Sequence, residues 1–129
     1  MKNKKIIVSI LSLSLLIMGG AKVSQAATKG YSFRLPSTGY RTTESVVKDD
    51  NGQFLNQVNY NGRPDYRIDF WGTNNNSRYT TQSYFYGTGA KYANYGTNPE
   101  VYNGKDFYMT IKTGPTTFVE IDVNGYFAP

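Results

Sequence analysis

Apolar and polar residues alternate in short runs along this chain, and the clearest run lies near its middle, at residues 66–72 (YRIDFWG). Strand side chains point to opposite faces with a period of two, so this run predicts a β-strand with two unlike faces. The predicted core face consists of Tyr66, Ile68 and Phe70. The predicted solvent face consists of Arg67, Asp69 and Trp71. Because an indole left among charges at a surface is costly, Trp71 is the first candidate for a binding role.

Other alternating runs predict further strands and two hairpins. The runs at 40–48 and 53–60 flank residues 49–52 (DDNG), and Asn-Gly between strand-like runs is a strong hairpin signal. A second hairpin is predicted between 106–112 and 117–124, which carry the cleanest apolar faces of the chain. Turn signals recur every eight to twelve residues or so, and no run keeps a helical period. The fold is therefore predicted to be all-β, a single antiparallel β-sandwich or small barrel of about 7–8 strands.

Two further segments carry specific expectations. The strand predicted at 78–86 should place Phe85 inside and Tyr84 outside. Residues 35–39 (LPSTG) spell a sortase anchoring pattern, but anchoring also needs an apolar tail and a basic end directly downstream. Because a polar strand follows instead, we interpret the pentapeptide as a turn.

The first 26 residues predict a cleaved export signal. Three lysines precede an apolar run at 6–18, and the small residues at 24–26 fit cleavage near Ala26. That run is shorter than the roughly 20 residues that a membrane-spanning helix needs. We therefore expect one all-β domain at 27–129 that is secreted, either extracellular or associated with the cell wall, with no transmembrane segment in the mature chain.

Composition narrows the class of partner. Four of the 14 basic residues lie in the predicted signal, which leaves ten basic against nine acidic residues, a net charge of +1. Both signs are interspersed, which argues against a nucleic-acid partner. Cysteine is absent, so the domain folds without disulfides. The part after residue 26 has 11 Val, Leu and Ile against 12 Tyr and 7 Phe, so its core is expected to be built largely of rings.

The residue types present exclude most enzyme chemistry. Histidine is absent as well as cysteine, which removes the usual triads, thiol nucleophiles and ordinary zinc sites. Carboxylates remain, but no spacing singles out a pair, so we expect no catalytic residues and no cofactor. Residues 48–52 (KDDNG) gather oxygen ligands and raise the alternative of a calcium site. They lack the spaced acids of a recognised calcium loop, so no metal site is expected.

Aromatic residues near Trp71 make up the predicted binding site. An aromatic platform can stack on sugar rings or insert among lipid headgroups. The candidate ligand-binding residues are Trp71, Tyr84, Tyr86, Tyr92, Tyr95, Arg67 and Asp69. The alternative is that these rings fill a core that is short of aliphatic residues.

Several motifs support a resemblance. They are residues 69–71 (DFW), 84–89 (YFYGTG), 92–95 (YANY) and 123–129 (VNGYFAP). In these positions the chain resembles a family of small exported proteins of Gram-positive bacteria classed as a domain of unknown function, which implies no catalytic residues. Its size, strand pattern and lack of cysteine are also distantly similar to the lactococcin-type β-sandwich bacteriocins. Those are exported unmodified and attack cell-wall synthesis in related bacteria, but the present chain is longer and lacks their histidines.

The sequence thus predicts a secreted, non-enzymatic β-sandwich that binds a cell-envelope component or another extracellular ligand through a face rich in tyrosine and tryptophan. One alternative is a bacteriocin-like antimicrobial protein acting on the envelope of related bacteria. A second is a structural or matrix protein that self-associates through exposed strand edges. The oligomeric state stays open.

Overall fold

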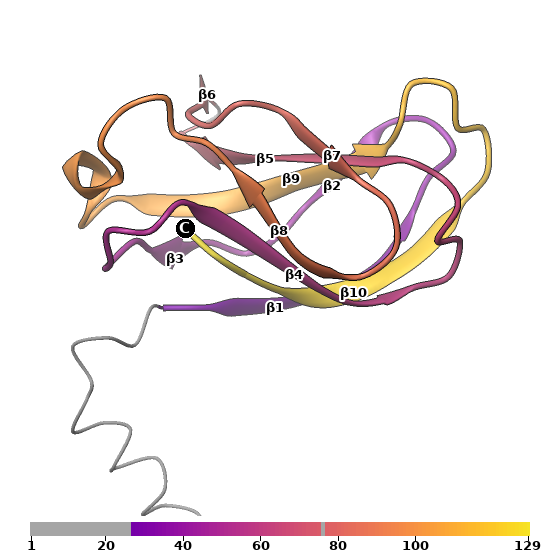
Figure 1. Cartoon of the computed structure of the whole chain (residues 1–129), viewed down its shortest axis with the longest axis horizontal. Coiled ribbons are helices and arrows are strands. Elements are labelled where there is room, and N and C mark those ends of the chain that lie inside the picture. Colours follow the sequence, from indigo (N-terminus) through magenta and orange to yellow (C-terminus); the bar gives the residue numbers. More distant parts are fainter. Residues whose placement is uncertain (1–26, 76) are drawn as a thin grey trace, which may run out of the picture.

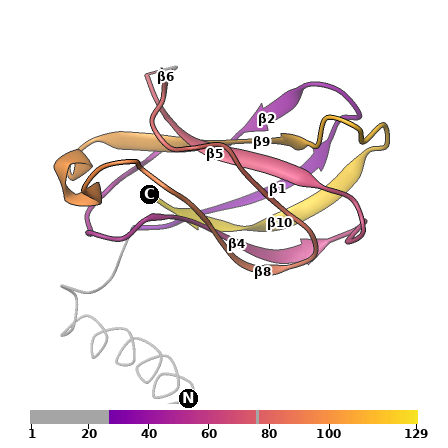
Figure 2. The same ribbon diagram turned by 45° about the horizontal axis from the view of Figure 1, so that its top comes forward.

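The computed structural model describes residues 27–75 and 77–129, and the predicted export signal lies outside them. Two antiparallel sheets pack face to face, as two layers in Figure 1 and again in the turned view of Figure 2. The first sheet runs in the order β1 (Lys29–Leu35), β10 (Ile121–Ala128), β4 (Phe54–Asn61) and β8 (Gly89–Ala93). The second runs in the order β2 (Tyr40–Thr42), β9 (Asp106–Thr113), β5 (Ile68–Asn74) and β6 (Ser77–Arg78). This confirms the all-β sandwich.

Three short elements complete the architecture. β3 (Val46–Val47) pairs with β9, and β7 (Ser83–Phe85) pairs with β5. The 3-10 helix η2 (Pro99–Tyr102) lies in the loop before β9. Within the described part of the chain, no helix is long and apolar enough to cross a membrane.

Rings make up seven of the fifteen buried residues described in the core between the sheets, so the prediction of a core built largely of rings is correct only in part. Phe54 of β4 stacks on Phe127 at 5.5 Å between centroids and meets Phe70 of the opposite sheet at 6.3 Å. Gly72 faces Phe54 across the sandwich, and a Cβ there would lie 2.6 Å from the Phe54 ring. A glycine at this position of β5 therefore makes room for the central ring of the core.

The hairpin predicted between 106–112 and 117–124 is wrong. β9 pairs with β5 and β2, whereas β10 pairs with β1 and β4 in the other sheet. Both apolar faces are buried in the one core between the sheets, but they come from opposite layers instead of lying side by side in one layer. Alternation shows which face of a strand is buried. It does not show whether the next strand with a buried face lies beside it in the same sheet or across the core in the opposite sheet.

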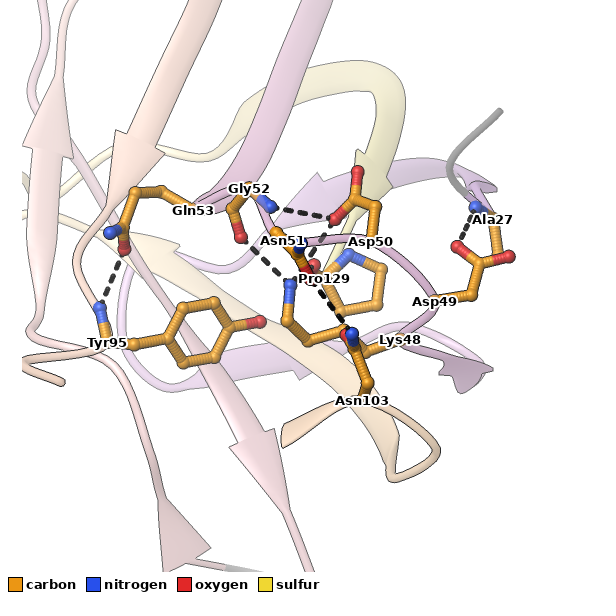
Figure 3. A network of polar contacts seen from close by, with 10 residues as sticks. All are labelled: Ala27, Lys48, Asp49, Asp50, Asn51, Gly52, Gln53, Tyr95, Asn103 and Pro129. Atoms are coloured by element: carbon orange, nitrogen blue, oxygen red, sulfur yellow. Dashed lines mark hydrogen bonds and ion pairs between the residues drawn. The ribbon is translucent and has the colours of Figure 1, made fainter. Parts of the chain in front are cut away.

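The hairpin predicted around 49–52 is also wrong. β3 pairs with β9, while β4 pairs with β10 and β8, so the turn carries the chain from one sheet to the other. Figure 3 shows what holds this corner: the buried ammonium of Lys48. Its Nζ donates to the backbone oxygens of Gly52 and Pro129, both at 2.8 Å, and lies 3.3 Å from Asp50 Oδ1.

The oxygens that raised the calcium alternative have partners within the protein. Asp50 Oδ1 lies 3.3 Å from the Lys48 ammonium and accepts the backbone N–H of Gly52 at 3.1 Å. Asp49 Oδ1 accepts the backbone N–H of Ala27 at 2.9 Å, and Asn51 Oδ1 accepts Asn103 Nδ2 at 3.0 Å. Burial lowers the pKa of Lys48, and the nearby Asp50 carboxylate opposes that effect. The turn therefore binds the chain's own cation.

The LPSTG segment forms a turn, as predicted. It begins at Leu35, the last residue of β1, whose side chain is buried in the core, and it leads to β2 in the opposite sheet. Gly39 has a φ of +90°, a conformation that glycine adopts without steric cost. The hydroxyl of Thr113 donates to the backbone oxygen of Pro36 at 3.2 Å and ties the turn to β9.

Candidate binding groove

The central strand β5 divides its side chains as predicted over most of its length. Ile68 and Phe70 are fully buried in the core, and Trp71 lies on the opposite, outer face of the second sheet, where it is half-buried. Two parts of the prediction are wrong. Tyr66 precedes the strand and is exposed, and Asp69 is only 1% exposed although it belongs to the outer face.

Trp71 lies in a groove of about 770 Å³ on that outer face. Antiparallel register places Trp71 opposite Thr110 of β9, and Thr110 opposite Thr42 of β2. One row further along, Thr73 lies opposite Tyr108. The groove is lined by Tyr40, Thr42, Thr43, Trp71, Thr73, Arg78, Gln82, Tyr108 and Thr110. It therefore combines three aromatic rings with four threonines, of which Thr73 and Thr110 are buried and form its floor.

The floor of the groove is held by contacts between strands. The hydroxyls of Thr73 and Thr110 lie 2.9 Å apart and share a hydrogen bond in which either can donate. The Thr43 hydroxyl accepts the backbone N–H of Met109 at 2.9 Å. The first contact joins β5 to β9, and the second ties the residue after β2 to β9, so most of the groove is set on paired strands.

A chain of four side chains, which we call the polar chain, runs along one side of the groove: Arg67, Asp69, Gln82 and Arg78. The Asp69 carboxylate accepts Arg67 Nε at 2.7 Å and Arg67 Nη2 at 3.2 Å. It also accepts Gln82 Nε2 at 2.7 Å. The amide oxygen of Gln82 then accepts Arg78 Nη1 at 2.9 Å. Because Asp69 can only accept, it fixes which end of the Gln82 amide faces Arg78.

The buried Asp69 is explained by what surrounds it. Its hydrogen bonds raise the pKa of Arg67, and the Arg67 guanidinium lies 4.2 Å from the centroid of the Tyr84 ring. Gly114 leaves space beside the same arginine, since a Cβ there would lie 2.8 Å from Arg67 Cγ. Three donors and a covering arginine thus remove Asp69 from water without leaving the carboxylate unpaired.

Trp71 itself is covered on one side by Arg78. The guanidinium carbon lies 5.3 Å from the centroid of the indole, a cation–π distance. Gln82 holds this guanidinium through the bond described above. The indole and the arginine therefore form one unit within the groove.

The structure brings four of the seven predicted site residues together. They lie on the outer face of the second sheet and are Trp71, Arg67, Asp69 and Tyr84. Tyr84 is 59% exposed, as predicted, while Phe85 is buried. Tyr86 is exposed beside Tyr84, with ring centroids 6.4 Å apart.

The other two tyrosines lie elsewhere. Tyr92 is exposed on β8 of the first sheet and does not line the groove. Placing Tyr95 on the exposed face is wrong, because it is 5% exposed and packs in the core against Tyr102 and Phe107. β8 ends at Ala93, so alternation no longer governs where Tyr95 points. Burial raises the pKa of its phenol.

Sequence reasoning missed most of the lining residues. Tyr40, Thr42, Tyr108 and Thr110 reach the groove through pairing of β2 and β9 with β5, which no local pattern reveals. Arg78 ends the two-residue strand β6, and Gln82 lies in the loop after it. The four-residue spacing of these two side chains was the one local sign that they could contact each other, but contacts at that spacing are typical of helices.

The described residues include no acidic side chain among those that line the groove. Nor do residues 27–75 and 77–129 gather three His, Cys, Asp or Glu side chains that could hold a metal ion. No family model, curated protein or solved structure matches this chain. The resemblances drawn from the sequence therefore stay predictions.

Proposed function

We propose that this chain is an exported, non-enzymatic binding protein and that its groove receives a saccharide or a related polyol component of the cell envelope or of the extracellular medium. The observation that carries the proposal is the composition of the groove, which is lined by Trp71 and two tyrosines together with four threonines. Sugars offer apolar ring faces edged with hydroxyls, and aromatic rings beside polar groups that can both donate and accept fit those surfaces.

The residues that line the groove favour binding over catalysis. A glycosidase needs two carboxyl groups flanking the scissile bond, and the groove lining has no carboxyl group. The nearest carboxylate along β5, that of Asp69, is buried and its oxygens already accept three hydrogen bonds. The chain also has no histidine or cysteine to supply a base or a nucleophile.

Binding can be measured with the single tryptophan as reporter. The purified protein should sediment with insoluble cell-wall polysaccharide from Gram-positive bacteria, and its Trp71 fluorescence should shift when that material is added. We expect Trp71→Ala to weaken sedimentation by about tenfold or more, the effect of losing roughly 1.4 kcal/mol of contact.

Tyr92→Ala is the matched control for Trp71→Ala. It also removes an aromatic ring from the surface, but Tyr92 lies on the first sheet, away from the groove. It should bind as the unaltered protein does. Equal binding by the Trp71→Ala variant, with its circular dichroism unchanged, would refute the proposed site.

Export has its own test. When the full chain is produced in a Gram-positive host, intact-mass analysis of the medium should find a protein that begins at Ala27. Protein that stays in the cell with its first 26 residues attached would contradict the proposed export.

A further inference from the structure

Resting on the proposed saccharide site, we propose that the ligand of the groove is anionic, a polysaccharide or polyol polymer bearing carboxylate or phosphate groups, and that Arg78 binds its acidic group. The inference comes from the charge of the groove, from the free donors of Arg78 and from the way Arg78 covers Trp71.

The charge of the groove is positive. Arg78 is the only charged residue among the nine that line it. The Asp69 carboxylate borders the groove but is paired with Arg67 and is almost fully buried. On the same outer face, Lys112 of β9 lies in register with Tyr40 and Asp69 and adds a second cation near the groove.

Arg78 also differs from the two arginines that are paired with acids. Arg34 contacts both Glu120 and Asp122, and Arg67 contacts Asp69. Among the described residues Arg78 forms no ion pair, and its hydrogen bond there is to the neutral amide of Gln82. A guanidinium has five N–H donors in a planar fork, so most of those on Arg78 stay available to a carboxylate or phosphate.

The stacking of Arg78 on Trp71 argues against a neutral sugar as the main ligand. A neutral ring that lay flat on the covered face of the indole would have to displace the guanidinium. An acidic group can instead meet the edge of the guanidinium where it stands. Since Gln82 and Trp71 already fix that edge, binding costs less side-chain entropy than at a freely rotating arginine.

The test compares three polymers by isothermal titration calorimetry: polygalacturonate, which carries carboxylates, poly(glycerol phosphate), which carries phosphates, and neutral dextran. The unaltered protein should bind one or both acidic polymers at least about tenfold more tightly than dextran. That preference should shrink when the NaCl concentration rises from about 50 to about 500 mM. Which acidic polymer binds more tightly identifies the acidic group.

Three variants assign the effect. Arg78→Gln should lose the preference for acidic polymers and its salt dependence, and Arg78→Lys should keep part of both. Arg63→Gln is the matched control, because Arg63 is exposed and lies outside the groove. It should behave as the unaltered protein does.

The outcomes separate this inference from the proposed function. Trp71-dependent binding of dextran that equals binding of the acidic polymers would overturn the anionic ligand and leave the saccharide site standing. An Arg78→Gln variant that keeps the full preference for acidic polymers would also overturn the role of Arg78. Absence of binding to all three polymers, or binding that Trp71→Ala does not weaken, would overturn both proposals.

Discussion

The strongest prediction of the structure concerns Asp69, whose carboxylate is buried on the outer face of a sheet. Asp69→Asn keeps the shape of the side chain but replaces one acceptor with a donor. The amide oxygen can accept from Arg67 or from Gln82, so at least one of these donors then faces an N–H group instead of an oxygen. A buried hydrogen bond to a charged group contributes about 1.5–3 kcal/mol, and removing one partner of a buried pair costs about 3–5 kcal/mol. Arg67 is 36% exposed and regains water, so we expect a loss of about 2–3 kcal/mol.

Urea denaturation followed by fluorescence measures that loss. The matched control is Asp122→Asn, because Asp122 is also bonded to an arginine, with Arg34 Nε at 3.1 Å from its Oδ1, but both side chains are more than half exposed. Exposed ion pairs contribute little, so this variant should lose no more than about 0.5 kcal/mol. Equal losses in the two variants would refute the conclusion that burial gives the Asp69 contacts their weight.

Three further perturbations test the fold. Burial raises the pKa of Tyr31 and Tyr95, so above about pH 10.5 the unfolded chain loses these two protons while the folded chain keeps them. The free energy of unfolding should therefore fall by about 1.4 kcal/mol per pH unit for each tyrosine. Urea denaturation at several alkaline pH values checks this. Gly125→Ala places a Cβ 1.9 Å from the backbone oxygen of Gln57, and we expect a loss of more than about 3 kcal/mol in thermal unfolding, or no folding. Lys48→Met leaves two carbonyl acceptors unpaired and should cost about 2–4 kcal/mol in the same assay, whereas an unchanged melting temperature would show that the buried ammonium does not hold its corner.

Local sterics explain which parts of the fold the sequence predicts. Alternation assigned Ile68 and Phe70 to the core and Trp71 to the outer face because a strand turns successive side chains by half a rotation whatever it pairs with. The same rule placed Phe85 inside and Tyr84 outside. It failed at Tyr66, which lies just before the strand begins.

Pairing between strands could not be predicted in this way. A turn such as Asp49–Gly52 shows that the chain changes direction, but it does not show whether the next strand joins the same sheet or the opposite one. In this chain the buried ammonium of Lys48 bonds the turn to Pro129, far along the sequence, and only the folded chain brings the two together. Most residues of the groove were missed for the same reason, since β2 and β9 contribute them through long-range register.

Asp69 shows how far a local pattern can mislead about a site. Alternation put it on the correct face, but its exposure was decided by side chains from elsewhere in the chain, namely Gln82 and the Tyr84 ring over Arg67. Stability alone does not account for a carboxylate at this position, because a well-packed apolar pair of similar volume often stabilises a protein as much as a buried ion pair does. What an apolar side chain cannot do is accept the Gln82 N–H and so turn the amide oxygen toward Arg78. Through Gln82, the Asp69 carboxylate therefore orients the acceptor that holds the Arg78 guanidinium beside the Trp71 ring.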